Sequence, residues 1–184
     1  MKRVWKAISV VTLAVGLVAG LVFYLFSFGY AVDVSDSDRA WLVKAQDFAP
    51  YLQGFDPKLG RESFGHRRTV LGEDTLTYEF FGSGEPRLLL ENRLRIQRDE
   101  RSAEAFYRHL SAVVIDPTNL GSSGGIDRFR PTVENEVLKW GEESEFLTLH
   151  NDANQAIGDS FRARQGKAVF QFVMFGLTLD RKST

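Results

Sequence analysis

Cysteine is entirely absent from this 184-residue chain. Its absence excludes a disulfide framework, a thiolate nucleophile, a cysteine-ligated zinc or iron–sulfur site, and a lipid attached through cysteine. A domain of about 150 residues buries roughly 68–70% of the surface of its unfolded chain, so it does not need such cross-links. We expect no cofactor.

The chain also lacks an excess of basic residues, with 23 Lys and Arg against 24 Asp and Glu. Three of the basic residues, Lys2, Arg3 and Lys6, lie in the first 32 residues, which contain no acid. Residues 33–184 therefore carry 20 basic and 24 acidic residues, a net charge of −4. A nucleic-acid-binding domain usually shows the opposite balance, so nucleic acid is not an expected partner.

The most prominent feature that is present is an uncharged run of 26 residues, 7–32, after the basic start "MKRVWK". A helix of this length would reach roughly 39 Å, against about 30 Å for a hydrocarbon core. We expect a transmembrane signal anchor at 7–32, a cytoplasmic tail at 1–6 and an extracytoplasmic domain at 33–184. The expected location is the cell membrane, single-pass, with the N-terminus in the cytoplasm and the domain outside, which is the periplasm if the source is a Gram-negative bacterium.

Two details of this run leave alternatives open. Gly29 and Ala31 are small residues at the −3 and −1 positions of a cleavage site after Ala31, which would release a secreted ligand-binding domain. Gly16 and Gly20 have the G-x-x-x-G spacing that lets helices approach closely in a membrane. The expected partners are the lipid bilayer and either a membrane protein or a second copy paired through this helix.

The pattern of the remaining residues predicts an α+β fold, with a mostly antiparallel sheet packed by two or three helices. Apolar spacing indicates helices near 37–49 and 102–114, with an ambiguous segment near 132–140. Alternation indicates strands in "TLTYEFF" and "RLLLENRLRIQR", a shorter one near 67–71, and three more near 145–150, 157–164 and 168–179.

Candidate catalytic groups are few. "GSSGG" matches G-x-S-x-G with Ser123 as the would-be nucleophile, and Asp127 and His150 follow in hydrolase order. A nucleophile elbow must join a strand directly to a helix, whereas "DPTNL" precedes this motif and "IDRFRP" follows it. His150 and Asp152 could share an ion, but such residues are common at strand ends. We therefore predict no catalytic or metal-binding residue.

Arginines on the polar faces of two strands form the candidate binding site. If these strands face the same way, their side chains make a cationic patch for an anionic ligand, a lipid head group or an acidic partner. Alternatively, glutamates such as Glu79, Glu91 and Glu145 pair with them and the face is merely solvated. The predicted residues are Arg93, Arg95, Arg162 and Arg164.

These patterns favour a non-catalytic binding or accessory domain tethered to a membrane, such as an assembly or sensing subunit of a membrane complex. Tethering would raise the effective concentration of the domain near its partners. The alternative function is an extracytoplasmic hydrolase-type enzyme.

Overall fold

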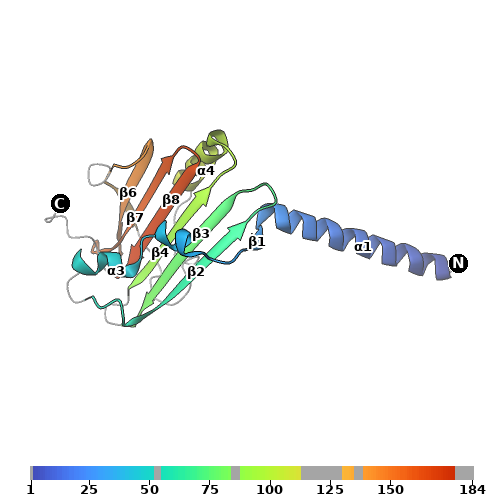
Figure 1. Ribbon diagram of the computed structural model, residues 1–184, viewed down its shortest axis with the longest axis horizontal. Coiled ribbons are helices and arrows are strands. Elements are labelled where there is room, and N and C mark those ends of the chain that lie inside the picture. Colours follow the sequence, from blue (N-terminus) through green and yellow to red (C-terminus); the bar gives the residue numbers. More distant parts are fainter. Residues whose placement is uncertain (1, 52–54, 84–87, 113–129, 135–138, 177–184) are drawn as a thin grey trace.

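The computed structural model describes residues 2–51, 55–83, 88–112, 130–134 and 139–176 (Figure 1). Its helices are α1 (Lys2–Ser27), α2 (Asp36–Ala40), α3 (Ala45–Phe48), the 3-10 helix η1 (Ala49–Tyr51) and α4 (Glu100–Ala112). Its strands are β1 (Tyr30–Ala31), β2 (Gly60–Arg68), β3 (Asp74–Gly82), β4 (Leu89–Ile96), β5 (Arg130–Val133), β6 (Glu143–His150), β7 (Ala156–Gln165) and β8 (Ala168–Phe175).

The strands form one eight-stranded antiparallel sheet in the order β1-β2-β3-β4-β8-β7-β6-β5. Two four-stranded meanders, β1–β4 and β5–β8, are thus joined along the pair β4–β8. The predicted α+β class is wrong, because the chain is mostly this sheet and has few helices. The antiparallel pairing itself follows from short connections such as the turn at Gly166 between β7 and β8, which has a φ of 53°.

One face of the sheet, here called the α3 face, carries the main core. Strand alternation directs Tyr78, Leu90 and Phe172 to this face, where they join a buried cluster with Leu42 and Ala45. Phe48 of α3 stacks on Phe172 at a ring-centroid distance of 5.1 Å. Burial of these aromatic side chains supplies most of the apolar contact between the short helices and the sheet.

The predicted helix at 37–49 is replaced by two short helices, α2 and α3. Ser35 caps α2 through a capping box with Asp38, which fixes its start, and the chain leaves the helix at Trp41. The break lets the carbonyl of Val43 accept a hydrogen bond from the side chain of Asn92, which is fully buried in β4. The break thus supplies an acceptor for the buried Nδ2 group of Asn92.

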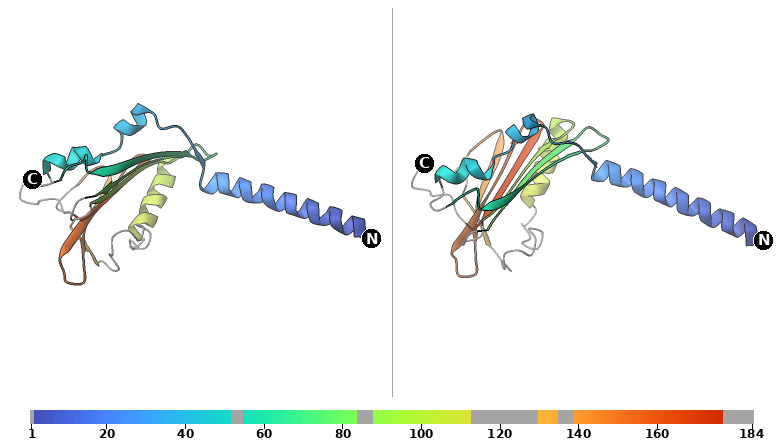
Figure 2. Two further views of the ribbon diagram at one scale, coloured as in Figure 1. Left: turned by 90° about the horizontal axis from the view of Figure 1, so that it is seen from below. Right: turned by 60° about the horizontal axis from the view of Figure 1, so that its bottom comes forward.

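The opposite face, here called the α4 face, is covered by α4 over β7 and β8 (Figure 2). Ala103 and Tyr107 of α4 pack on Val169 of β8, as expected from the helical spacing of apolar residues in this segment. On β2, β3 and β4 the same face carries polar side chains such as Arg67, Thr75 and Arg93, and Phe106 of α4 contacts Arg95 beside them. The candidate site lies on this polar part.

Helix α1 projects away from the sheet (Figure 1), and Gly29, with a φ of 70°, turns the chain from it into β1. Within the described ranges, no helix combines the length and the apolar character that crossing a membrane requires. The predicted anchor at 7–32, the single-pass topology and the cell-membrane location are corrected accordingly.

Candidate functional site

The four predicted arginines project from the same face of the sheet, the α4 face. In the β4–β8 and β8–β7 registers, Arg93 and Arg162 flank Gln171 in one row across the strands. Arg95 and Arg164 flank Val169 in the next row. The two arginine-bearing strands face the same way, although β8 lies between them.

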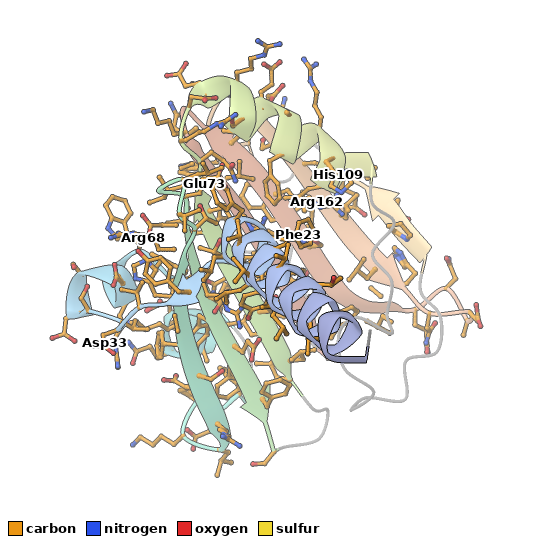
Figure 3. All side chains as sticks on the ribbon, turned by 90° about the vertical axis from the view of Figure 1, so that its right-hand side faces the viewer. Phe23, Asp33, Arg68, Glu73, His109 and Arg162 are labelled. Carbon is orange, nitrogen blue, oxygen red and sulfur yellow. The ribbon has the colours of Figure 1, made fainter. Side chains whose placement is uncertain are left out.

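Two of these arginines make structural contacts. Arg162 is 2% exposed; its Nη1 donates to the carbonyl of Leu110 in the last turn of α4 and lies 3.7 Å from Glu145. A cation at this position complements the helix dipole, and burial lowers the pKa of Arg162. Figure 3 shows its side chain beneath α4, on the side of His109.

Arg164 is bound by two carboxylates. Its Nη1 lies 2.6 Å from Glu142 and its Nε lies 2.8 Å from Glu143, and the hydrogen bond to Glu143 raises the pKa of Arg164. Arg162 and Arg164 therefore hold α4 and β6 in place, and their charges are already compensated within the protein.

Arg93 and Arg95 on β4 are less engaged in ion pairs within the protein than Arg162 and Arg164. Arg93 pairs with Glu91 at 2.7 Å, but its Nε is buried without a hydrogen-bond partner. The guanidinium of Arg95 lies 4.4 Å from the ring centroid of Phe106 in α4, and its side chain makes no hydrogen bond or ion pair to the residues that the structure describes. Burial lowers the pKa of Arg95, and the adjacent charge of Arg93 adds to this effect.

A third arginine, which the sequence reasoning missed, completes the group. Arg67 of β2 lies opposite Thr75 of β3, and Thr75 lies opposite Arg95. Arg93 lies opposite Thr77 in the neighbouring row. Arg67, Arg93 and Arg95, here called the arginine cluster, therefore surround two threonines. Arg67 begins the strand predicted near 67–71, but the observed strand β2 runs from Gly60 to Arg68, and the neighbours of Arg67 depend on the sheet register.

A glycine keeps this surface open between the arginines. Gly65 lies opposite Thr77, and a Cβ atom at Gly65 would approach the Oγ1 of Thr77 to 2.6 Å. That hydroxyl donates to the Gly65 carbonyl at 3.4 Å, whereas the hydroxyl of Thr75 has no partner among the described residues. Thr75 is thus the free hydroxyl in the row between Arg67 and Arg95.

The acidic residues around the arginine cluster do not neutralise it. Glu91 is engaged by Arg93, and Glu79 accepts a hydrogen bond from Ser63 at 3.1 Å. The charge of Glu73 acts to raise the pKa of Arg95, against the larger effect of burial, but no ion pair joins the two side chains. Arg67 and Arg95 therefore have no carboxylate partner within the part of the chain that the structure describes.

A second polar cluster, also missed from the sequence, lies on the α3 face. His66 is buried, with its Nε2 2.7 Å from Asp74 and its Nδ1 3.3 Å from Asp38; Arg68 also pairs with Asp74, at 2.8 Å. Burial acts to raise the pKa of Asp74, but hydrogen bonds from Arg68 and His66 outweigh it and lower the pKa. Because Asp38 belongs to α2, this cluster fastens α2 to the sheet.

The other predicted residues do not form a site with these. Gly16 and Gly20 have open space around them on α1. Ser123 and Asp127 lie outside the described residues. His150, at the end of β6, has its Nδ1 3.4 Å from the hydroxyl of Thr132. Among the residues that the structure describes, no group of three His, Asp or Glu side chains is arranged to hold a metal ion.

Comparison with known proteins finds no family model that matches the chain, and no curated protein or solved structure that matches it. The interpretation of the site therefore rests on its own geometry and charge.

Proposed function

We propose that this protein is a non-catalytic binding domain, in an accessory or sensing role, that recognises an anionic ligand at the arginine cluster. The observation that carries the proposal is the uncompensated charge of Arg67 and Arg95 on the face of the sheet beside α4. By contrast, Arg68, Arg162 and Arg164 all contact carboxylates. The contrast between these paired arginines and Arg67 and Arg95 supports a ligand at the arginine cluster.

The charge balance of the domain strengthens this argument. Residues 33–184 have a net charge of −4, so an excess of unpaired cations on one surface is not a consequence of the overall composition. Guanidinium groups also present planar, directional donors that suit oxyanions better than a simple positive field does. Binding without catalysis is the function that this arrangement supports, since the cluster contains neither a nucleophile with a base nor a candidate metal site.

The proposal can be tested by thermal unfolding of the full chain in chloride, sulfate, phosphate and citrate at constant ionic strength. A multivalent anion that binds only the folded state at a concentration 100 times its Kd stabilises it by about 2.7 kcal/mol. The double variant Arg67→Gln/Arg95→Gln should lose this stabilisation.

The matched control is Arg98→Gln/Arg108→Gln, which removes the same number of charges from exposed positions that pair with Asp99 and Glu104. We expect this control to retain the anion response of the wild-type protein. Equal responses of the two double variants would contradict the proposed function, as would the absence of any anion-specific stabilisation.

A further inference from the structure

The arginine cluster differs in shape from a simple carboxylate site. Arg67 and Arg95 stand two strands apart, which places their Cα atoms roughly 9.5 Å from each other, with Thr75 between them. Arg93 lies two residues along β4, about 6.8 Å from Arg95. Three arginines thus project from one face around Thr75, whereas a carboxylate is planar and is fully recognised by a single guanidinium fork.

The charge of the cluster also indicates a dianion. Three guanidinium groups surround Thr75 and Thr77, and Glu91 compensates one of them through its 2.7 Å contact with Arg93. Arg67 and Arg95 then contribute a charge of +2, which Glu73 reduces near Arg95; a phosphate monoester carries about −1.5 to −2 at pH 7. A single carboxylate would leave one cation of the cluster without a partner.

The contact with α4 prepares Arg95 for such a ligand. The ring of Phe106, 4.4 Å from the guanidinium carbon, holds the Arg95 group against the helix, so less side-chain entropy is lost on binding. The hydroxyl of Thr75 is half-buried beside it and has no partner within the described ranges. Its O–H can donate to a ligand oxygen that sits between Arg67 and Arg95.

We propose that the arginine cluster binds a phosphate group, held by Arg67, Arg93 and Arg95 and by a hydrogen bond from Thr75. This inference rests on the proposed function and adds the chemical class of the ligand. Glu73 limits the affinity of the cluster for phosphate. Its negative charge acts on Arg95 and would repel a dianion bound there.

Isothermal titration calorimetry of the full chain tests this inference with inorganic phosphate, O-phosphoserine and glutamate at pH 7.5 and fixed ionic strength. We expect phosphate or phosphoserine to bind at least tenfold more tightly than glutamate. Binding of inorganic phosphate alone identifies the free ion as the source, and binding of phosphoserine identifies a phosphate monoester; either outcome supports the proposal.

Thr75→Val and Thr77→Val form a matched pair of variants. Thr75→Val keeps the β-branched shape but removes the free hydroxyl, and should weaken phosphate binding about tenfold, as expected for a hydrogen bond to a charged group. Thr77→Val should have little effect, because its hydroxyl already donates to Gly65. Glu73→Gln should tighten phosphate binding several-fold.

Two outcomes would overturn the phosphate assignment while leaving the proposed function in place. One is equal affinity for glutamate and phosphoserine, with both lost in Arg67→Gln/Arg95→Gln. The other is unchanged phosphate affinity in a folded Thr75→Val protein. If none of the anions binds the wild-type chain, the proposed function itself fails.

Discussion

Replacement of Arg95 by methionine should stabilise the ligand-free protein. Arg95 is a partly buried cation that makes no ion pair to the described residues, and both burial and the neighbouring charge of Arg93 lower its pKa. Methionine retains an unbranched side chain that can lie on Phe106 and α4. The substitution therefore removes an unfavourable charge and keeps most of the packing.

The size of the effect follows from two opposing contributions. Two unit charges at the spacing of the Arg93 and Arg95 Cα atoms, about 6.8 Å, would repel by roughly 0.6 kcal/mol in water and by roughly 2.4 kcal/mol at an effective dielectric constant near 20. The pairing of Arg93 with Glu91 reduces this repulsion. The contact of Arg95 with Phe106 offsets about 0.5–2 kcal/mol of this repulsion. Since burial of the charge adds a further cost, we expect the free energy of unfolding to rise by about 1 kcal/mol in Arg95→Met.

This stabilisation should not depend on pH between 5 and 9. The pKa of Arg95 is lowered in the folded state from a strongly alkaline value, so the folded and unfolded states are both charged throughout this range. The unfolded state binds more protons only at alkaline pH, and only there would the unfavourable contribution of Arg95 be relieved.

Urea unfolding monitored by tryptophan fluorescence, with and without phosphate, measures both sides of the argument. Without phosphate, Arg95→Met should be more stable than the wild type; at saturating phosphate the order should reverse, because only the wild type is stabilised by the ligand. A loss of more than about 1 kcal/mol without phosphate would refute the electrostatic reasoning, and full phosphate stabilisation of the variant would refute the role of Arg95 in binding.

Three further predictions concern the framework of the site. Tyr78→Phe should lower the free energy of unfolding by about 2 kcal/mol, because the buried amide of Ala45 loses its 2.7 Å acceptor; a loss under about 0.5 kcal/mol in urea unfolding would contradict this. Gly158→Ala should destabilise the sheet by about 3 kcal/mol or more, since its Cβ would lie 2.1 Å from the carbonyl oxygen of Met174; near-wild-type thermal unfolding would disprove the close approach. The lowered pKa of Asp74 stabilises the fold above its unfolded pKa near about 3.9 and is lost as pH falls through the folded pKa. Asp74→Asn should therefore be less stable at pH 7 but lose less stability than the wild type between pH 5 and pH 3, and parallel acid-unfolding curves would argue against this.

The orientation of individual side chains could be predicted from the sequence, because strand alternation is a local property. Arg93 and Arg95 were placed correctly on the polar face of their strand, as the β4 register shows. Which strands become neighbours is a property of the whole chain. That strand order decides that Arg162 and Arg164 contact α4 and β6, whereas Arg93 and Arg95 do not pair in this way. It also decides where Arg67 lies.

The two short helices and the histidine cluster could not be predicted from local sequence patterns, for a related reason. The apolar spacing at 37–49 is compatible with one helix, but the buried side chain of Asn92 requires the carbonyl of Val43 as an acceptor. His66, Asp38 and Asp74 come from three separate elements, so nothing in their spacing indicates that they meet. Such long-range demands of buried polar groups override local propensity.

The joining of the two meanders along β4–β8 has a consequence for how the protein assembles. Residues such as Leu89 and Phe175, far apart in the chain, pair across this seam, so its closure carries the entropic cost of a long loop. Arg67 and Thr75 lie in the first meander, but Phe106, which positions Arg95, belongs to a helix that rests on strands of the second. The arginine cluster is therefore complete only once both halves have joined, and a ligand that binds there selects chains that have finished folding.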